Sequence, residues 1–150
     1  MRSSRQLVTT ALFLTGVVAS TVTPASAQTL NYGVSCSANA SVINETMTSL
    51  GTYVVTMRHV INCNQPVEQI IARATDYKEG FQSSSSRSAS QTCTNTDFCS
   101  VFIDVPAQNC PNGWFILRTS GDIGKPGNIR YYGSLTEVRQ RLFWYSPICS

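Results

Sequence analysis

Six cysteines restrict what this chain can fold into, and all of them follow an N-terminal segment with the features of an export signal. An even number of cysteines in an exported chain predicts disulfides rather than free thiols. A zinc site is the alternative, but the chain has one histidine, His59, and no C-x2-C pair, so we expect no metal site. Spacing alone leaves several connectivities open. The favoured pairs are sequential: Cys36–Cys63, Cys93–Cys99 and Cys110–Cys149.

Residues 1–27 carry the parts of a secretory signal. Arg2 and Arg5 give a positive start, a short apolar stretch follows, and small residues up to Ala27 form a cleavage site. The apolar stretch is shorter than the roughly 20 residues that span a bilayer. We therefore predict a signal peptide over 1–27, a single domain over 28–150, a secreted product and no membrane insertion.

The predicted domain is close to neutral. Loss of Arg2 and Arg5 lowers the 11 basic residues of the chain to 9, against 8 acidic residues, for a formal charge of +1. Sequence-independent nucleic-acid binding and electrostatic membrane binding both need a dense basic surface. We therefore expect the protein to bind neither nucleic acid nor a membrane surface. We also expect no cofactor. The expected partner is another protein or a surface polysaccharide.

Alternation of apolar and polar residues predicts strands rather than helices. Two alternating segments come first, at 34–42 and 53–63. If Thr46 pairs with Tyr53, Cys36 lies directly opposite Cys63 on a shared face, at a separation that suits a disulfide. This register is the strongest argument for that bridge.

The remaining strands complete a sandwich. They are expected at 67–75, after a turn at Asn64-Gln-Pro66, and at 100–105, 114–119, 129–132 and 138–145. Ser134-Leu-Thr-Glu137 also fits a capping box, so a short helix over 135–141 is the alternative there. Short strands separated by turns predict an all-β fold, an antiparallel disulfide-braced β-sandwich that is immunoglobulin-like in general architecture.

The polar segment from Gln82 to Thr92 lacks periodicity, so we expect an exposed flexible loop there. A mobile connection between sheets is one interpretation. A recognition loop over 80–99, held at its far end by the Cys93–Cys99 bridge, is the other.

Catalytic signatures are weak. His59 is the only imidazole, and alternation places it on an apolar face, which favours a core histidine over a catalytic base. A hydrolase would need to combine it with Glu45 or Glu68 and with Arg58 or Arg73. Neighbouring strand residues such as Arg58 and His59 point to opposite faces, which makes a shared site hard to build. A nucleophile elbow is absent, and no acidic residues are paired in the sequence.

Aromatic residues near the C-terminus suggest a binding surface. Tyr131–Tyr132 and Phe143–Tyr145 fall in adjacent predicted strands, so some of these rings could form a stacking platform. The alternative is that Trp144 completes the core with Val138 and Leu142. Arginines and aromatic residues, which are enriched at interfaces, alternate with these core positions. The candidate binding residues are Arg139, Arg141, Phe143 and Tyr145.

Three functional classes stay open. A non-catalytic binding or inhibitor module, acting through loop 80–99 and the C-terminal aromatic strip, fits best. A cell-envelope structural protein is the second class, and a small secreted hydrolase that uses His59 is the third. Sequons at Asn39 and Asn44 would be used only in a host that glycosylates exported proteins.

Overall fold

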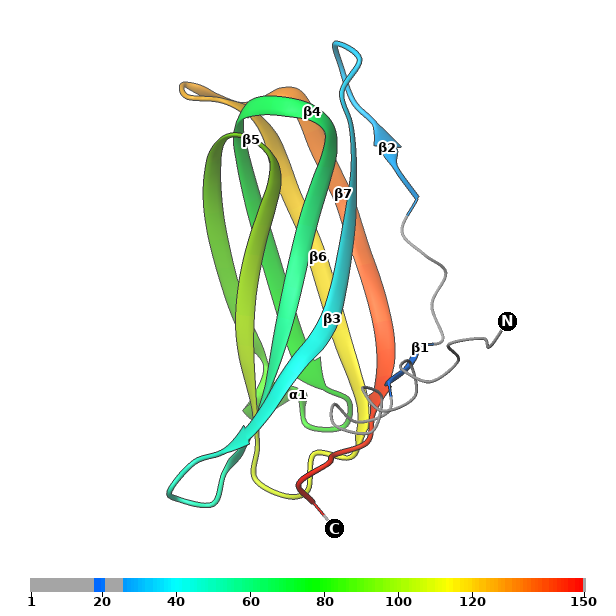
Figure 1. The fold of residues 1–150 in the computed structure, drawn as a ribbon, viewed down its shortest axis with the longest axis vertical. Helices are drawn as coiled ribbons and strands as arrows, with labels where there is room; N and C mark the ends of the chain where they lie inside the picture. The colour runs from blue at the N-terminus through cyan, green and yellow to red at the C-terminus, as the bar shows by residue number, and fades with distance from the viewer. Residues whose placement is uncertain (1–17, 21–25, 150) are drawn as a thin grey trace, which may run out of the picture.

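Strands account for most of the chain that the computed structural model describes, which is residues 18–20 and 26–149. Every strand pairing is antiparallel (Figure 1). The elements are β1 (Val18–Ser20), β2 (Gln28–Thr29), β3 (Ser35–Met47), β4 (Tyr53–Lys78), α1 (Gln82–Ser85), β5 (Arg87–Ala107), β6 (Gly113–Lys125) and β7 (Asn128–Trp144). The predicted signal over 1–27 lies outside the described residues except for β1 and residues 26–27, and its role stays a prediction.

Two long strands, β4 and β5, each run through both layers of the fold. The first half of β4 pairs with β3 and with the end of β5, whereas its second half pairs with β6 and with the start of β5. Between these halves, β4 bends across the top of Figure 1. One layer therefore contains β2, β3 and the adjoining halves of β4 and β5. The other layer, here called the β6–β7 layer, contains the remaining halves with β6, β7 and β1.

The expected turn at Asn64–Pro66 is wrong, because this segment is a bend inside β4 rather than a break between strands. The pairing of β4 with β5 stops at Asn62 and resumes at Val67. Pro66, which has no backbone N–H to donate, lies in the unpaired interval where none is needed. The confirmed part of the prediction is the all-β, antiparallel, disulfide-braced fold. Its sandwich and immunoglobulin-like detail stays a prediction.

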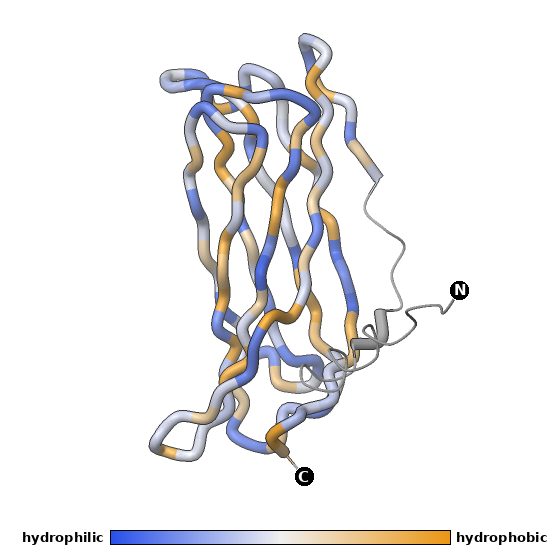
Figure 2. The backbone as a smooth tube through the Cα atoms, in the orientation of Figure 1, coloured by the Kyte–Doolittle hydropathy of each residue, from blue (hydrophilic) through white to orange (hydrophobic). Residues whose placement is uncertain are grey.

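The core lies between the inward faces of the two layers. Figure 2 shows hydrophobic and hydrophilic residues alternating along many strands, as expected where only one face of a strand is buried. Burying a large apolar side chain contributes roughly 1.5–3 kcal/mol. Fully buried apolar residues from the two layers are Val55, Met57, Ile61, Ile70, Phe115, Leu117 and Ile123.

Side chains join the layers where the edges of β3 and β7 approach each other. Gln140 on β7 accepts a hydrogen bond from Ala40 N at 2.7 Å and donates to Ala40 O at 3.2 Å. Its amide thus occupies the place of a backbone partner for β3. Further along the same junction, Trp144 Nε1 donates to Glu45 at 3.2 Å. These contacts leave the sheet nearly closed.

The disulfides are the three pairs favoured by the sequence: Cys36–Cys63, Cys93–Cys99 and Cys110–Cys149. The register places Cys36 directly opposite Cys63. A bulge further along β3 then shifts the pairing by one residue, so Thr46 faces Val54 instead of Tyr53, as the sequence had suggested. The bulge adds a residue to one strand only, and alternation in the sequence does not reveal it.

The expected flexible loop from Gln82 to Thr92 is also wrong. This segment forms α1 and then the start of β5, whose backbone pairs with the second half of β4. The pattern is strand-like but polar on both sides: Ser88 and Ser90 lie opposite outward-facing residues of β4, and Ala89 lies opposite buried Ala74. Hydroxyl side chains do not prevent backbone pairing, so this segment forms an edge strand although its low hydrophobicity predicted a loop.

β7 is a single continuous strand, so the alternative helix over 135–141 does not form. Leu135 is buried at 3 % exposure within this strand. The two expected strands at 129–132 and 138–145 are consequently one. Tyr131–Tyr132 and Phe143–Tyr145 thus lie near opposite ends of β7 and do not share a platform. No helix of the described residues is long and apolar enough to cross a membrane.

Candidate protein-binding face

The C-terminal strip that the sequence suggested lies on the outer face of the β6–β7 layer. Leu142 and Trp144 are buried at 3 % and 2 % exposure, as expected for core residues. Alternation therefore turns Arg139, Arg141 and Phe143 outward, where Arg139 is exposed and the other two are half-buried. Tyr145, just beyond the end of β7, is 56 % exposed.

Trp114 on β6 completes this strip, and the sequence analysis missed it. It pairs with Phe143 across the two strands, with ring centroids 5.3 Å apart in an edge-to-face arrangement. The Arg141 guanidinium lies 3.9 Å from the Trp114 ring centroid. The available signal was alternation within 114–119: Phe115 and Leu117 are buried, so Trp114 points outward.

An ion pair fixes the Arg141 guanidinium on the indole ring. Arg141 donates two hydrogen bonds to the Glu79 carboxylate, at 2.7 and 3.0 Å. The hydrogen bond from Arg141 lowers the pKa of Glu79, and the same bond raises the pKa of Arg141. A two-bond pair of this kind restricts guanidinium orientation more than a single bond would.

Arg118 and Arg139 lie directly opposite each other on β6 and β7. Among the described residues, neither has a carboxylate within 4.0 Å. Arg118 lies 5.7 Å from the Tyr77 ring centroid, and its Nε is buried without a hydrogen-bond partner. Like charges at directly opposite positions destabilise a strand pair. The face therefore presents two neighbouring guanidinium groups without a direct carboxylate contact among the described residues. At longer range, Arg118 interacts with Asp76 and Arg139 with Glu79.

Two more arginines extend the face toward the start of β7. Arg73 and Arg130 contact the two oxygens of Asp122, at 2.7 and 3.1 Å. Burial opposes ionisation of Asp122, but hydrogen bonds from Ser134 and Arg73, together with the Arg73 charge, outweigh it and lower the pKa. We call the following residues the arginine face: Arg73, Arg118, Arg130, Arg139 and Arg141.

The segment 80–99, the other contact region suggested by the sequence, borders the arginine face. Within β5, Ser88 lies opposite Thr75, and Ser90 lies opposite Arg73. Ser88 Oγ and Thr75 Oγ1 are 2.9 Å apart and hydrogen-bonded. The structure therefore brings the start of β5 and the C-terminal strip onto one layer, a proximity that no pattern in the sequence had indicated.

Tyr131 and Tyr132 form a separate cluster with Tyr32, near the opposite end of β7 from the strip. Tyr32 and Tyr131 are stacked, with centroids 4.8 Å apart, and Lys125 Nζ lies 3.8 Å from the Tyr131 ring centroid. Tyr132 donates a 2.7 Å hydrogen bond to Glu68, which lowers the pKa of that carboxyl. The sequence placed aromatic residues here but did not indicate Tyr32.

His59 is a core residue, as the sequence suggested. It is 0 % exposed, with Nε2 2.6 Å from Asp76 and Nδ1 2.7 Å from Thr119 Oγ1. Burial raises the pKa of Asp76, and its hydrogen bond and charge interaction with His59 oppose that rise. The imidazole is thus out of contact with solvent and fully hydrogen-bonded.

The other residues considered for a hydrolase have separate partners. Glu45 bonds Trp144, and Glu68 bonds Tyr132. Arg58 lies over Phe98, 5.5 Å from its ring centroid. The structure therefore does not assemble them around His59. Within residues 18–20 and 26–149, no group of three or more His, Cys, Asp or Glu residues is placed to hold a metal ion.

Comparison of the chain with protein-family models and with curated proteins found no match. The case for function therefore rests on the geometry of the arginine face.

Proposed function

We propose that the protein is a secreted, non-catalytic binding protein that docks on an acidic protein surface through its arginine face. The observation that carries this proposal is the opposed pair Arg118 and Arg139, which has no carboxylate partner among the described residues. A carboxylate from a partner would accept hydrogen bonds from these groups and relieve their mutual repulsion.

The neighbouring strip supplies the apolar contacts that such an interface needs. The Trp114 ring contacts Phe143 edge to face and lies under the Arg141 guanidinium, whose freedom the ion pair with Glu79 limits. Arginine and tryptophan are the residue types most often found at interface hot spots. Side chains held in place before binding lose less conformational entropy when the partner docks. The arrangement therefore favours protein recognition over diffuse attraction of polyanions.

Secretion is supported by two independent features. Residues 1–27 carry the sequence pattern of an export signal, and the structure contains three disulfides, which form and persist in oxidising compartments. A rigid framework outside the cell is suited to presenting a fixed binding face.

Affinity capture with matched variants tests the proposal. The full chain is produced in an export-competent host, and the intact mass of the product shows whether residues 1–27 were removed. The oxidised protein is immobilised beside two variants, Arg118→Gln/Arg139→Gln and a control, Arg58→Gln/Lys125→Gln. The control removes the same charge from positions outside the arginine face. Both variants are checked for unchanged circular dichroism before use.

We expect one acidic protein, recovered near stoichiometrically from host medium or envelope extract, to bind the wild type and the control. The double substitution on the arginine face should weaken it by about 10- to 100-fold, since a desolvated charge pair is worth several kcal/mol. Equal weakening by the control would reject the arginine face as the site. Retention of polysaccharide, or of the protein alone, would instead favour the envelope-associated structural role.

A further inference from the structure

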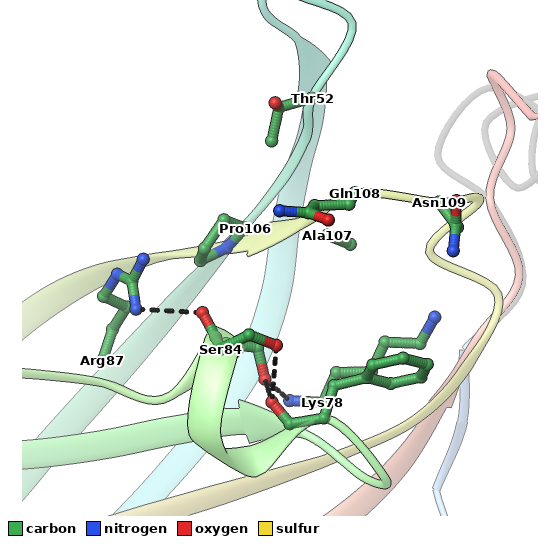
Figure 3. A pocket seen from close by; sticks show the side chains of 10 residues that line it. Thr52, Lys78, Ser84, Arg87, Pro106, Ala107, Gln108 and Asn109 are labelled. Carbon is green, nitrogen blue, oxygen red and sulfur yellow. Dashed lines mark hydrogen bonds between the residues drawn. The ribbon is translucent and has the colours of Figure 1, made fainter.

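A pocket of about 190 Å³ opens at one end of the molecule, apart from the arginine face (Figure 3). One wall is the end of β4 with α1, and the opposite wall is the end of β5 with the loop that follows it. Ser85 holds the first wall together, because its Oγ accepts from Lys78 N at 2.9 Å and donates to Phe81 O at 2.7 Å. Pockets for drug-sized ligands measure roughly 300–1,000 Å³, so this one suits a smaller molecule.

Lys78 supplies a nearly buried cation to this pocket. The residue is 8 % exposed, and its Nζ donates to Cys110 O at 3.2 Å and lies 5.1 Å from the Phe81 ring centroid. Among the described residues it has no carboxylate within 4.0 Å. Burial lowers the pKa of Lys78, as expected for an ammonium without a counter-ion. An ammonium group has three N–H donors, and the bond to Cys110 O uses one of them, so Lys78 can donate further hydrogen bonds to a ligand.

The rest of the lining is positive or neutral. Arg87 lines the pocket and is held by hydrogen bonds to Ser84 O and Ser86 O, at 3.4 and 2.8 Å. No aspartate or glutamate of the described part of the chain lines the pocket. Apolar surface comes from Phe81 and Pro106, while Gln108 and Asn109 bring side-chain amides to the facing wall. The pocket thus combines cations, neutral donors and apolar surface.

We propose that this pocket binds a small organic monocarboxylate. The carboxylate would accept hydrogen bonds from Lys78 and neutralise its charge, and the apolar body would pack against Phe81 and Pro106. A multiply charged inorganic anion fits less well, because much of the lining is apolar and would desolvate it without replacing its water contacts.

Titration by two-dimensional NMR tests the assignment, with butyrate as the probe and the neutral isostere butyramide as its comparison. The protein is the oxidised exported chain, and the readout is the saturation of amide shifts at Phe81, Ser85 and Ala107. Lys78→Met removes the cation and keeps most of the apolar stem. Lys125→Met is the matched control, since Lys125 lies over Tyr131 and does not line the pocket.

We expect butyrate to saturate the wild type and the control, with binding at least about tenfold weaker for butyramide and for Lys78→Met. Equal binding of butyramide, equal binding by Lys78→Met, or no saturable shift with butyrate would each overturn the proposal. Sulfate that binds as tightly as butyrate would reduce the pocket to an unspecific anion site. If Lys78→Met does not fold, the pH dependence of butyrate binding to the wild type still tests the proposal. Butyrate affinity must fall as pH rises through the titration of Lys78, and a pH-independent affinity would refute the role of that group.

Discussion

Replacing His59 with leucine should be among the most destabilising single substitutions in this protein. His59 and Asp76 are both 0 % exposed and lie 2.6 Å apart between the two layers. Among the described side chains, His59 is the one that hydrogen-bonds the Asp76 carboxyl group, through Oδ2. His59→Leu removes this hydrogen bond and also leaves Thr119 Oγ1 without the imidazole.

The expected cost follows from this loss of partners. Removing the hydrogen-bond partner of a buried carboxyl group costs about 3–5 kcal/mol, because the remaining group stays desolvated. Leucine fills a volume close to that of histidine, so a cavity adds little. With a denaturant slope of about 2 kcal/mol/M, the urea midpoint should fall by about 1.5–2.5 M.

A double-mutant cycle with Asp76→Leu separates the polar contact from simple damage to packing. Urea unfolding is followed by tryptophan fluorescence, to which Trp144, at 2 % exposure, should contribute. The variants are His59→Leu, Asp76→Leu and the double substitution, and Met57→Leu is the control at a fully buried neighbouring position. The control should cost less than about 1.5 kcal/mol, since its volume is nearly conserved.

We expect the double variant to be clearly more stable than the sum of the single losses predicts, because it leaves neither group without its partner. If the losses simply add, or if His59→Leu costs no more than Met57→Leu, the contact is not the coupled pair described. The same variant addresses the hydrolase alternative: if folded His59→Leu keeps its full biological effect, an acid–base role for this residue is excluded.

Three other substitutions have expected outcomes. Gln140→Ala removes the amide that bonds both backbone groups of Ala40, and should cost about 1–3 kcal/mol and speed hydrogen exchange at the Ala40 amide. Asp122→Asn should lower the free energy of unfolding by about 1–3 kcal/mol near neutral pH. Because the pKa of Asp122 is lower in the folded than in the unfolded chain, this difference should be present above about pH 4 and lost as pH falls through the folded pKa, measured by urea unfolding at several pH values. Cys93→Ser/Cys99→Ser opens a loop of sequence separation 6 and should cost about 2 kcal/mol by chain entropy, measured by thermal unfolding.

Each of these has a control that the chain provides. Gln91→Ala removes an exposed amide that bonds only its neighbour's carbonyl, and it should leave exchange at β3 unchanged. Asp104→Asn removes a carboxylate bonded to Thr56 and to no arginine, so a pH profile matching that of Asp122→Asn would contradict the role given to the arginines. Opening Cys36–Cys63, with sequence separation 27, should cost about 3.5 kcal/mol, and the reverse order of the two bridges would contradict the entropic account.

Local alternation accounts for what could be predicted from sequence. A period of two residues assigns inward and outward faces wherever a strand has one buried side, and it placed His59 and Trp144 inside and Arg139 outside. The pairing of Cys36 with Cys63 followed from the same alternation and a short connecting turn. Both features depend on neighbouring residues or on strands that follow each other directly in the chain, so they can be recognised in a single sequence.

The features that could not be predicted depend on contacts between distant segments, or on backbone pairing of a segment whose residues show no alternation of apolar and polar side chains. The start of β5 is stabilised by its backbone pairing with β4, and its polar side chains do not produce the alternating pattern that predicts a strand. The opposition of Arg118 and Arg139 requires the register of β6 with β7, including its shift beyond Thr119. The pocket around Lys78 joins the end of β4 and α1 with residues that follow some twenty positions later.

Charge distribution explains why a nearly neutral chain still presents a basic face. Five of the 9 basic residues of the predicted domain lie on the outer side of one layer, a clustering that the net charge of +1 conceals. On that face, Asp122 and Glu79 each contact arginines directly. Arg118 and Arg139 form the central pair, and neither has a carboxylate within 4.0 Å among the described residues. At physiological ionic strength, screening limits charge effects to about 8 Å, so these two groups act on a docked partner rather than on a distant one. The near-neutral composition thus argues against a polyanion binder, and the proposed partner would instead place one or two carboxylates beside Arg118 and Arg139.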